Sequence, residues 1–160
     1  MNNLILVSIQ LVVFITYLIF IKVKFGNLSS ISLSWYKLQE HPPRNGYLFT
    51  LFCWGLAIPL ILFADTGGWL FFIAGSGLAF VGAATAFKEN LTDVVHFTGA
   101  SVAIVASLIG LWTYGGNWIS ITVVALGILY LRVFKVRNTI YWVEVISFAA
   151  IITGLLYIIL

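Results

Sequence analysis

MNNLILVSIQLVVFITYLIFIKVK, residues 1–24, is a long apolar run that ends in two lysines. A transmembrane helix needs about 20 predominantly apolar residues, and residues 4–23 supply them. A cleavable signal peptide carries its positive charge before the apolar run and small residues after it. Here Lys22 and Lys24 close the run. The order predicts an uncleaved first helix whose N-terminus lies outside the cytoplasm.

The rest of the chain has the same apolar character. Of its 160 residues, 62% are hydrophobic and 8% are charged, whereas a soluble domain has about 25% charged residues. We therefore predict an all-α fold, an integral membrane bundle of six transmembrane helices that forms a single domain over residues 1–160. The predicted helices cover residues 4–23, 47–64, 69–87, 94–114, 118–134 and 139–160.

The basic residues all belong to one side of this predicted bundle. They lie in or beside three loops, residues 24–46, 88–93 and 132–138, whereas the other turns and both chain ends have none. Because cytoplasmic loops collect Lys and Arg, we expect a multi-pass protein of the cell membrane with both termini on the non-cytoplasmic side. The basic residues are Lys22, Lys24, Lys37, Arg44, Lys88, Arg132, Lys135 and Arg137.

Two other readings of these charges are weaker. A five-helix topology would lose residues 118–134 and put Arg132 or Glu144 in a worse place, so it ranks second. The net charge of +3 does not indicate a nucleic-acid partner, because the basic residues flank apolar segments instead of clustering on one element.

Small residues form matching stripes on two of the predicted helices. Spacing of i, i+4, i+7 and i+11 puts each set on one helical face, where small side chains let membrane helices approach closely. A ligand lying against the bare backbone is the less favoured explanation. Short turns also predict that segments 47–64 and 69–87, and segments 94–114 and 118–134, are antiparallel neighbours. The stripes are Gly75, Ala79, Gly82 and Ala86, and Gly99, Ala103, Ala106 and Gly110.

Glu144 and His96 are the ionisable groups placed deepest in the predicted helices. Glu144 lies about five residues into its helix, which is roughly 8 Å below the interface at 1.5 Å per residue. A carboxyl group there should face the bundle and have a partner, and it is a candidate functional residue. It either pairs with a cation or carries a proton. His96 shares its face with Gly99, Ala103 and Ser107, so it should point inward at a similar depth.

The longest loop, residues 25–46, alternates apolar and polar side chains over residues 31–36. This period of two predicts an extended lid over the cytoplasmic mouth of the bundle. A plain interfacial linker anchored by Trp35 and Tyr36 is nevertheless the interpretation that we favour, and the lid is the alternative. A loop of this length is often functional.

Together these observations predict a polar site at the cytoplasmic side. We expect His96, Glu144, Asp93 and Lys88 to cluster there, with Ser32, Ser34 and Tyr36 closing over them. The competing interpretation is a satisfied hydrogen-bond network that fixes the packing of the helices. Ligands for zinc could be assembled from His96, Glu144, Asp93 and His41, but no helical pair of metal-binding histidines exists, so we expect no metal and no cofactor.

Two motifs carry a resemblance to known membrane proteins. Residues 30–32 (Ser-Ile-Ser) with residues 35–36 (Trp-Tyr), and VHFTGA at residues 95–100, resemble motifs of the DRAM-like, FGF-receptor-activating-protein-like family of six-helix membrane proteins. Over residues 30–38, 48–55 and 86–100, the chain also resembles small six-helix membrane proteins of bacteria and their phages. The resemblance implies a paired role for the serine-rich loop and His96, and the larger family is linked to lipid remodelling and membrane trafficking.

We therefore expect a membrane protein that binds a lipid headgroup or small amphiphile in a polar pocket at the cytoplasmic side. A lipid-modifying hydrolase that uses His96 is one alternative. A structural or interaction protein of the membrane is another. The expected partners are the lipid bilayer and a lipid or amphiphile ligand, and six helices in so short a chain make a homo-oligomer plausible.

Overall fold

The computed structural model describes residues 2–40, 43–84, 89–115 and 118–160, and every regular element in that part of the chain is a helix. The predicted all-α class is therefore confirmed. Each predicted apolar segment forms a helix over its described residues, and one short helix is additional. The helices are α1 (Asn3–Phe25), α2 (Leu33–Glu40), α3 (Tyr47–Gly67), α4 (Trp69–Ala83), α5 (Glu89–Gly115), α6 (Trp118–Val133) and α7 (Thr139–Ile159).

Four helices in the described residues are long and apolar enough to cross a membrane: α1, α3, residues 93–115 of α5, and α7. Their length and composition are those of membrane-spanning helices. The described part of α4 and the whole of α6 are apolar but have 15 and 16 residues, below the range of about 17–25 for a spanning helix.

Two of the helices end at glycines with positive φ values. Gly26, at φ 73°, follows α1, and its N–H donates to the carbonyl of Lys22 at 3.0 Å. Gly68, at φ 91°, separates α3 from α4, and its N–H donates to the carbonyl of Ala64 at 3.0 Å. A side chain is strained at such a φ value, so these glycines define where the chain leaves one helix.

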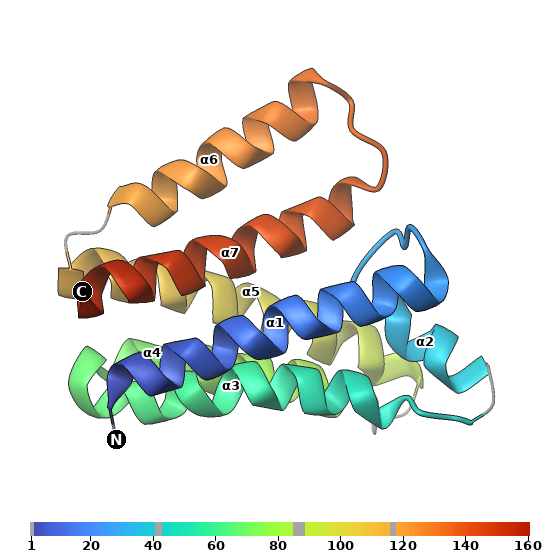
Figure 1. Cartoon of the computed structure of the whole chain (residues 1–160), viewed down its shortest axis with the longest axis horizontal. Coiled ribbons are helices and arrows are strands. Elements are labelled where there is room, and N and C mark those ends of the chain that lie inside the picture. Colours follow the sequence, from blue (N-terminus) through green and yellow to red (C-terminus); the bar gives the residue numbers. More distant parts are fainter. Residues whose placement is uncertain (1, 41–42, 85–88, 116–117) are drawn as a thin grey trace.

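The helices run back and forth between two ends of the bundle (Figure 1). Both chain termini lie at one end. The other end, which we call the basic end, collects the C-terminal ends of α1 and α6, all of α2, and the starts of α3 and α7. Every basic residue that the structure describes belongs to these segments or to the loops beside them. Lys88 lies outside the described residues.

Helices α3, α4 and α5 form the tightly packed part of the bundle. A methyl group added at Gly75 would lie 2.7 Å from the carbonyl oxygen of Ala57 on α3, and one added at Gly77 would lie 2.8 Å from that of Gly99 on α5. The first predicted stripe therefore packs against α3, and α4 approaches α5 through Gly77, which is not part of that stripe. Close packing is the role of these glycines.

Among the six apolar helices, α6 is the least integrated. It packs mainly against α7 and lies at the outer edge of the bundle (Figure 1). The prediction that α5 and α6 are close neighbours holds only near their connection, where the rings of Trp112 and Trp118 are 5.5 Å apart. A short turn fixes one end of a helix pair but not its whole length.

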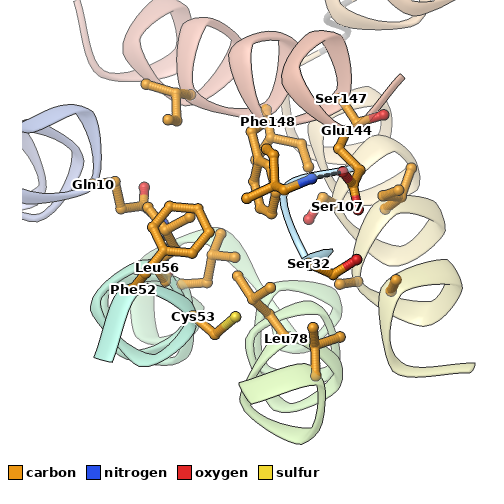
Figure 2. A pocket seen from close by; sticks show the side chains of 18 of the residues that line it. Gln10, Ser32, Phe52, Cys53, Leu56, Leu78, Ser107, Glu144, Ser147 and Phe148 are labelled. Carbon is orange, nitrogen blue, oxygen red and sulfur yellow. Dashed lines mark hydrogen bonds between the residues drawn. The ribbon is translucent and has the colours of Figure 1, made fainter. Parts of the chain in front are cut away.

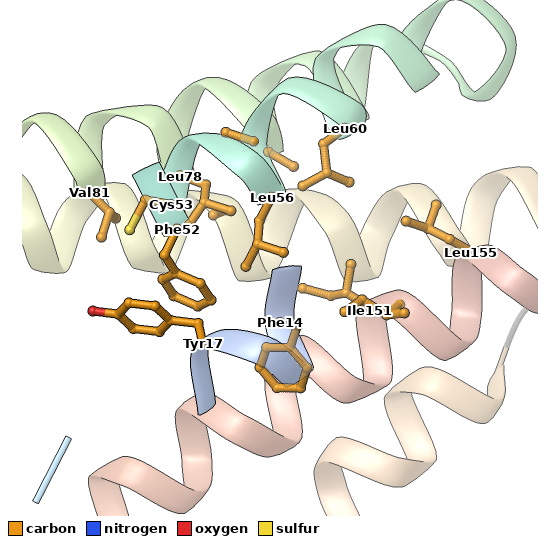
Figure 3. Packing of buried hydrophobic residues seen from close by; sticks show 14 of the residues in the cluster. Phe14, Tyr17, Phe52, Cys53, Leu56, Leu60, Leu78, Val81, Ile151 and Leu155 are labelled. Carbon is orange, nitrogen blue, oxygen red and sulfur yellow. The ribbon is translucent and has the colours of Figure 1, made fainter. Parts of the chain in front are cut away.

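The hydrophobic core lies between α1, α3, α4, α5 and α7 (Figure 3). The rings of Tyr17 and Phe52 stack at 4.2 Å, and Phe14 and Phe148 lie 5.7 Å apart. Gln10, buried on α1, donates its amide to the carbonyl of Leu56 at 2.8 Å. That carbonyl lies in the turn before Pro59, next to the Gly55 carbonyl that loses its helical partner because proline has no N–H.

Candidate functional site

The serine-rich segment forms a tight turn followed by a helix, so the prediction of an extended lid was wrong. The Ser30 hydroxyl accepts a hydrogen bond from the N–H of Leu33 at 3.1 Å, where α2 begins. Ile31, Ser34 and Leu38 are buried. Their spacing of three and four residues is that of one helical face. The alternation over residues 31–36 was too short to distinguish the strand period of two from the helical period of 3.6.

This segment is anchored to the first turns of α7. The N–H of Tyr141 donates to the carbonyl of Ser29 at 3.0 Å, and the N–H of Ile31 donates to Glu144 Oε2 at 2.5 Å. The first N–H groups of a helix have no partner within it, so the Ser29 carbonyl satisfies one of them. Glu144 thus has a structural role as an acceptor for the loop.

The half-buried Glu144 also faces a cavity between the helices, with a volume of about 60 Å³ (Figure 2). We call it the internal cavity. Its lining is almost entirely apolar and comes from α1, α3, α4, α5, α7 and the turn before α2. The polar side chains on its wall are Gln10, Ser32, His96, Ser107, Glu144 and Ser147.

Ser107 is the most unusual member of this lining. It is fully buried at 0% exposure, and no described residue hydrogen-bonds its hydroxyl group. A buried hydroxyl without a partner costs about 1–3 kcal/mol, so such groups in native proteins call for an explanation. The cavity beside Ser107 offers one, since a bound polar group there would complete its hydrogen bonding.

The structure brings three of the predicted site residues together, because His96, Glu144 and Ser32 all line the internal cavity. The His96 ring packs near Phe49, with centroids 6.5 Å apart. In the described part of the chain, no side chain hydrogen-bonds that ring.

The other predicted site residues lie elsewhere. Ser34 is buried, and its hydroxyl pairs with that of Tyr17 at 2.6 Å, so it joins α2 to α1. Tyr36 is 46% exposed and packs against Trp35. Asp93 is exposed within α5. Lys88 falls outside the described residues.

Three polar residues of the cavity were missing from the predicted site. Ser107 follows His96 by eleven positions, with Gly99 and Ala103 between them on one face, and Ser147 follows Glu144 by one helical turn. These spacings were visible in the sequence. Gln10 had no such signal, because nothing in the sequence relates α1 to the other helices.

The arrangement favours hydrogen bonding over metal chemistry. Among the described residues, no three His, Cys, Asp or Glu side chains are close enough to hold a metal ion. The cavity instead offers the acceptor oxygens of Glu144 and of three serines, together with one imidazole. Such a lining can orient a small polar group at one end of an apolar space.

No family model, curated protein or solved structure matches this chain. The resemblances noted over residues 30–36 and 95–100 therefore stay predictions.

Proposed function

We propose that this membrane protein binds a small amphiphile in its internal cavity. The observation that carries the proposal is the buried, unpaired Ser107 hydroxyl on the wall of a cavity that also contains His96 and Glu144. The apolar walls suit a hydrocarbon chain, and the few polar groups suit a single head group. Pockets for small molecules combine these features.

The size of the cavity limits the ligand. An apolar cavity of about 150 Å³ admits benzene, and this one measures about 60 Å³. A phospholipid headgroup is too large for it, so of the two predicted ligand classes we favour the small amphiphile.

The charge of the site favours a head group that donates hydrogen bonds. No ion pair is formed by Glu144 within the described part of the chain, and the serine hydroxyls can accept as well as donate. A buried carboxylate is far more stable beside a cation. A single-chain amine fits best, then an alcohol, and a fatty acid least.

The test measures how three two-carbon probes, ethylamine, ethanol and acetate, which match the small volume of the cavity, raise the unfolding temperature of the purified protein. We expect ethylamine to stabilise most and acetate least, and the preference to vanish in Glu144→Gln. Asp65→Asn removes a carboxylate from the opposite end and is the matched control. Equal responses of the wild type and Glu144→Gln to the probes would refute the proposal.

A lipid-modifying hydrolase that uses His96 ranks second. A general base must reach the group whose proton it takes, and no hydrogen bond joins His96 to a serine or an acid in the described residues. Turnover of a lipid ester by the wild type, absent in His96→Ala, would reverse this ranking.

We further propose that the bundle crosses the membrane six times with both termini outside and the basic end in the cytoplasm. The grouping of Lys and Arg at that end supports this orientation. Asp65→Cys and Lys135→Cys test it in intact cells, because Cys53 is buried and adds little labelling background. A membrane-impermeant maleimide should label Asp65→Cys directly and Lys135→Cys only after the cells are opened; the reverse result would invert the topology.

A further inference from the structure

A second pocket opens between the C-terminal end of α1 and the start of α7, at the basic end. Its volume is about 600 Å³, ten times that of the internal cavity. None of the residues that line it belongs to the internal cavity. It is therefore a separate feature, and we call it the peripheral pocket.

Two cationic side chains line the peripheral pocket, Lys22 from α1 and Arg137 from the loop before α7, and its lining contains no acidic residue. The Lys22 ammonium contacts the side-chain oxygen of Asn27, which leaves further donors free. Arg137 has no hydrogen-bond or ion-pair partner among the described residues. The pocket thus presents positive charge that nothing in the described chain neutralises.

The start of α7 adds to this positive field. Asn138 lines the pocket in a left-handed conformation at φ 61°, and its side chain makes no capping hydrogen bond. The N-terminus of a helix carries a partial positive charge and attracts anions. An anion held by Lys22 and Arg137 would therefore also lie in the favourable field of α7.

The remaining wall is apolar and aromatic. Leu18 and Ile19 lie on the membrane-spanning part of α1, and Tyr141 and Trp142 follow the start of α7. Tyr and Trp prefer the depth of lipid headgroups. A charged mouth at the basic end that continues into an apolar wall matches a lipid better than a free anion.

We propose that the peripheral pocket binds the phosphate group of an anionic phospholipid, with Lys22 and Arg137 as donors and the acyl chains against Leu18 and Ile19. Basic pockets between transmembrane helices at the cytoplasmic face are suited to anionic headgroups. This site is independent of the internal cavity and of the function proposed for it.

The test is a titration of the purified protein with phosphatidylglycerol or phosphatidylcholine, with bound lipid counted by native mass spectrometry. We expect phosphatidylglycerol to bind more tightly. Its affinity should fall about fivefold in Lys22→Gln or Arg137→Gln and about thirtyfold in the double variant. Because Arg137 is exposed in a loop, Arg137→Gln alone keeps the test valid if the double variant folds poorly.

The matched control is the double variant Lys24→Gln and Lys135→Gln. It removes two charges from the same end of the bundle, at residues that do not line the pocket. Retained phosphatidylglycerol binding in this control supports the proposal. An equal loss in the control would show general attraction to the basic end, and unchanged binding in the Lys22 and Arg137 variants would remove the site; either result overturns the proposal.

A competition experiment distinguishes a lipid ligand from free phosphate. Millimolar inorganic phosphate should not displace phosphatidylglycerol, because it has no chains to bury against α1. Displacement from the wild type but not from Arg137→Gln would assign the pocket to a soluble anion and overturn the lipid proposal.

Discussion

The contact between α4 and α5 and the contact between α6 and α7 each contain a glycine, but different groups lie opposite them. A methyl group added at Gly77 would meet the backbone of Gly99 at 2.8 Å, whereas one added at Gly127 would meet the side chain of Ile146 at 2.8 Å. A side chain can rotate away, and a backbone in a helix cannot. The first contact is therefore rigid and the second adaptable.

The rigid helix contact and the loop contacts of Glu144 belong to different parts of the bundle. In lipid, close packing replaces the hydrophobic effect as the force between helices, so α3, α4 and α5 carry the rigid part of the fold. The loop contacts of Glu144, by contrast, belong to α7, and α7 has the loosely attached α6 on its other side. Glu144 and Ser147 thus lie on the adjustable side of the internal cavity, whereas His96 and Ser107 lie on the rigid α5.

The largest expected effect comes from adding one methyl group to the rigid contact. Gly77→Ala should destabilise the protein by about 2–3 kcal/mol, the upper range for overpacking, because the helices must move apart. The measurement is the free energy of unfolding in detergent micelles, followed by helical circular dichroism.

Gly127→Ala is the matched control, with an expected loss below about 1 kcal/mol because the Ile146 side chain can shift. Equal losses at Gly77 and Gly127 would contradict the proposed difference between the two contacts.

A smaller effect is expected at the hydrogen bond that attaches α6. The buried Ser120 hydroxyl donates to the carbonyl of Ala150 on α7 at 2.9 Å. Ser120→Ala should cost about 0.6–1.7 kcal/mol, the range for hydrogen bonds between membrane helices. Thr153→Val serves as the control, because the exposed Thr153 hydroxyl bonds only within α7, to Ala149 and Ala150. If the two substitutions cost the same in unfolding measurements, Ser120 does not attach α6.

The smallest effect concerns Ser107. Ser107→Ala removes a buried hydroxyl without a partner, so the free energy of unfolding should stay the same or rise by less than about 1 kcal/mol. Ser147→Ala, on the α7 wall of the internal cavity, gives the comparison. A clear loss of stability in Ser107→Ala would show that this hydroxyl is already satisfied, which would weaken the case for a ligand beside it.

The helices could be predicted from the sequence because apolar runs and the lysines that end them are local signals. Helix α2 could not, because its buried face depends on Ser34 meeting Tyr17 of α1. His96 and Glu144 were placed on one cavity correctly from depth and helical face alone. The sequence did not show that Tyr36 and Asp93 lie away from the internal cavity, because a position near the basic end of the bundle does not decide which way a side chain points.

The hydrogen bond between Ile31 and Glu144 joins residues 113 positions apart, and this has a consequence for how the protein is made. Chains emerge from the ribosome at roughly 5–20 residues per second with the N-terminal part first. The serine-rich segment is therefore complete well before its partner on α7 exists. Docking of that segment must await insertion of α7, so the internal cavity acquires its Glu144 wall only after α1 to α6 have been made, and a chain truncated before α7 would leave that side of the cavity open.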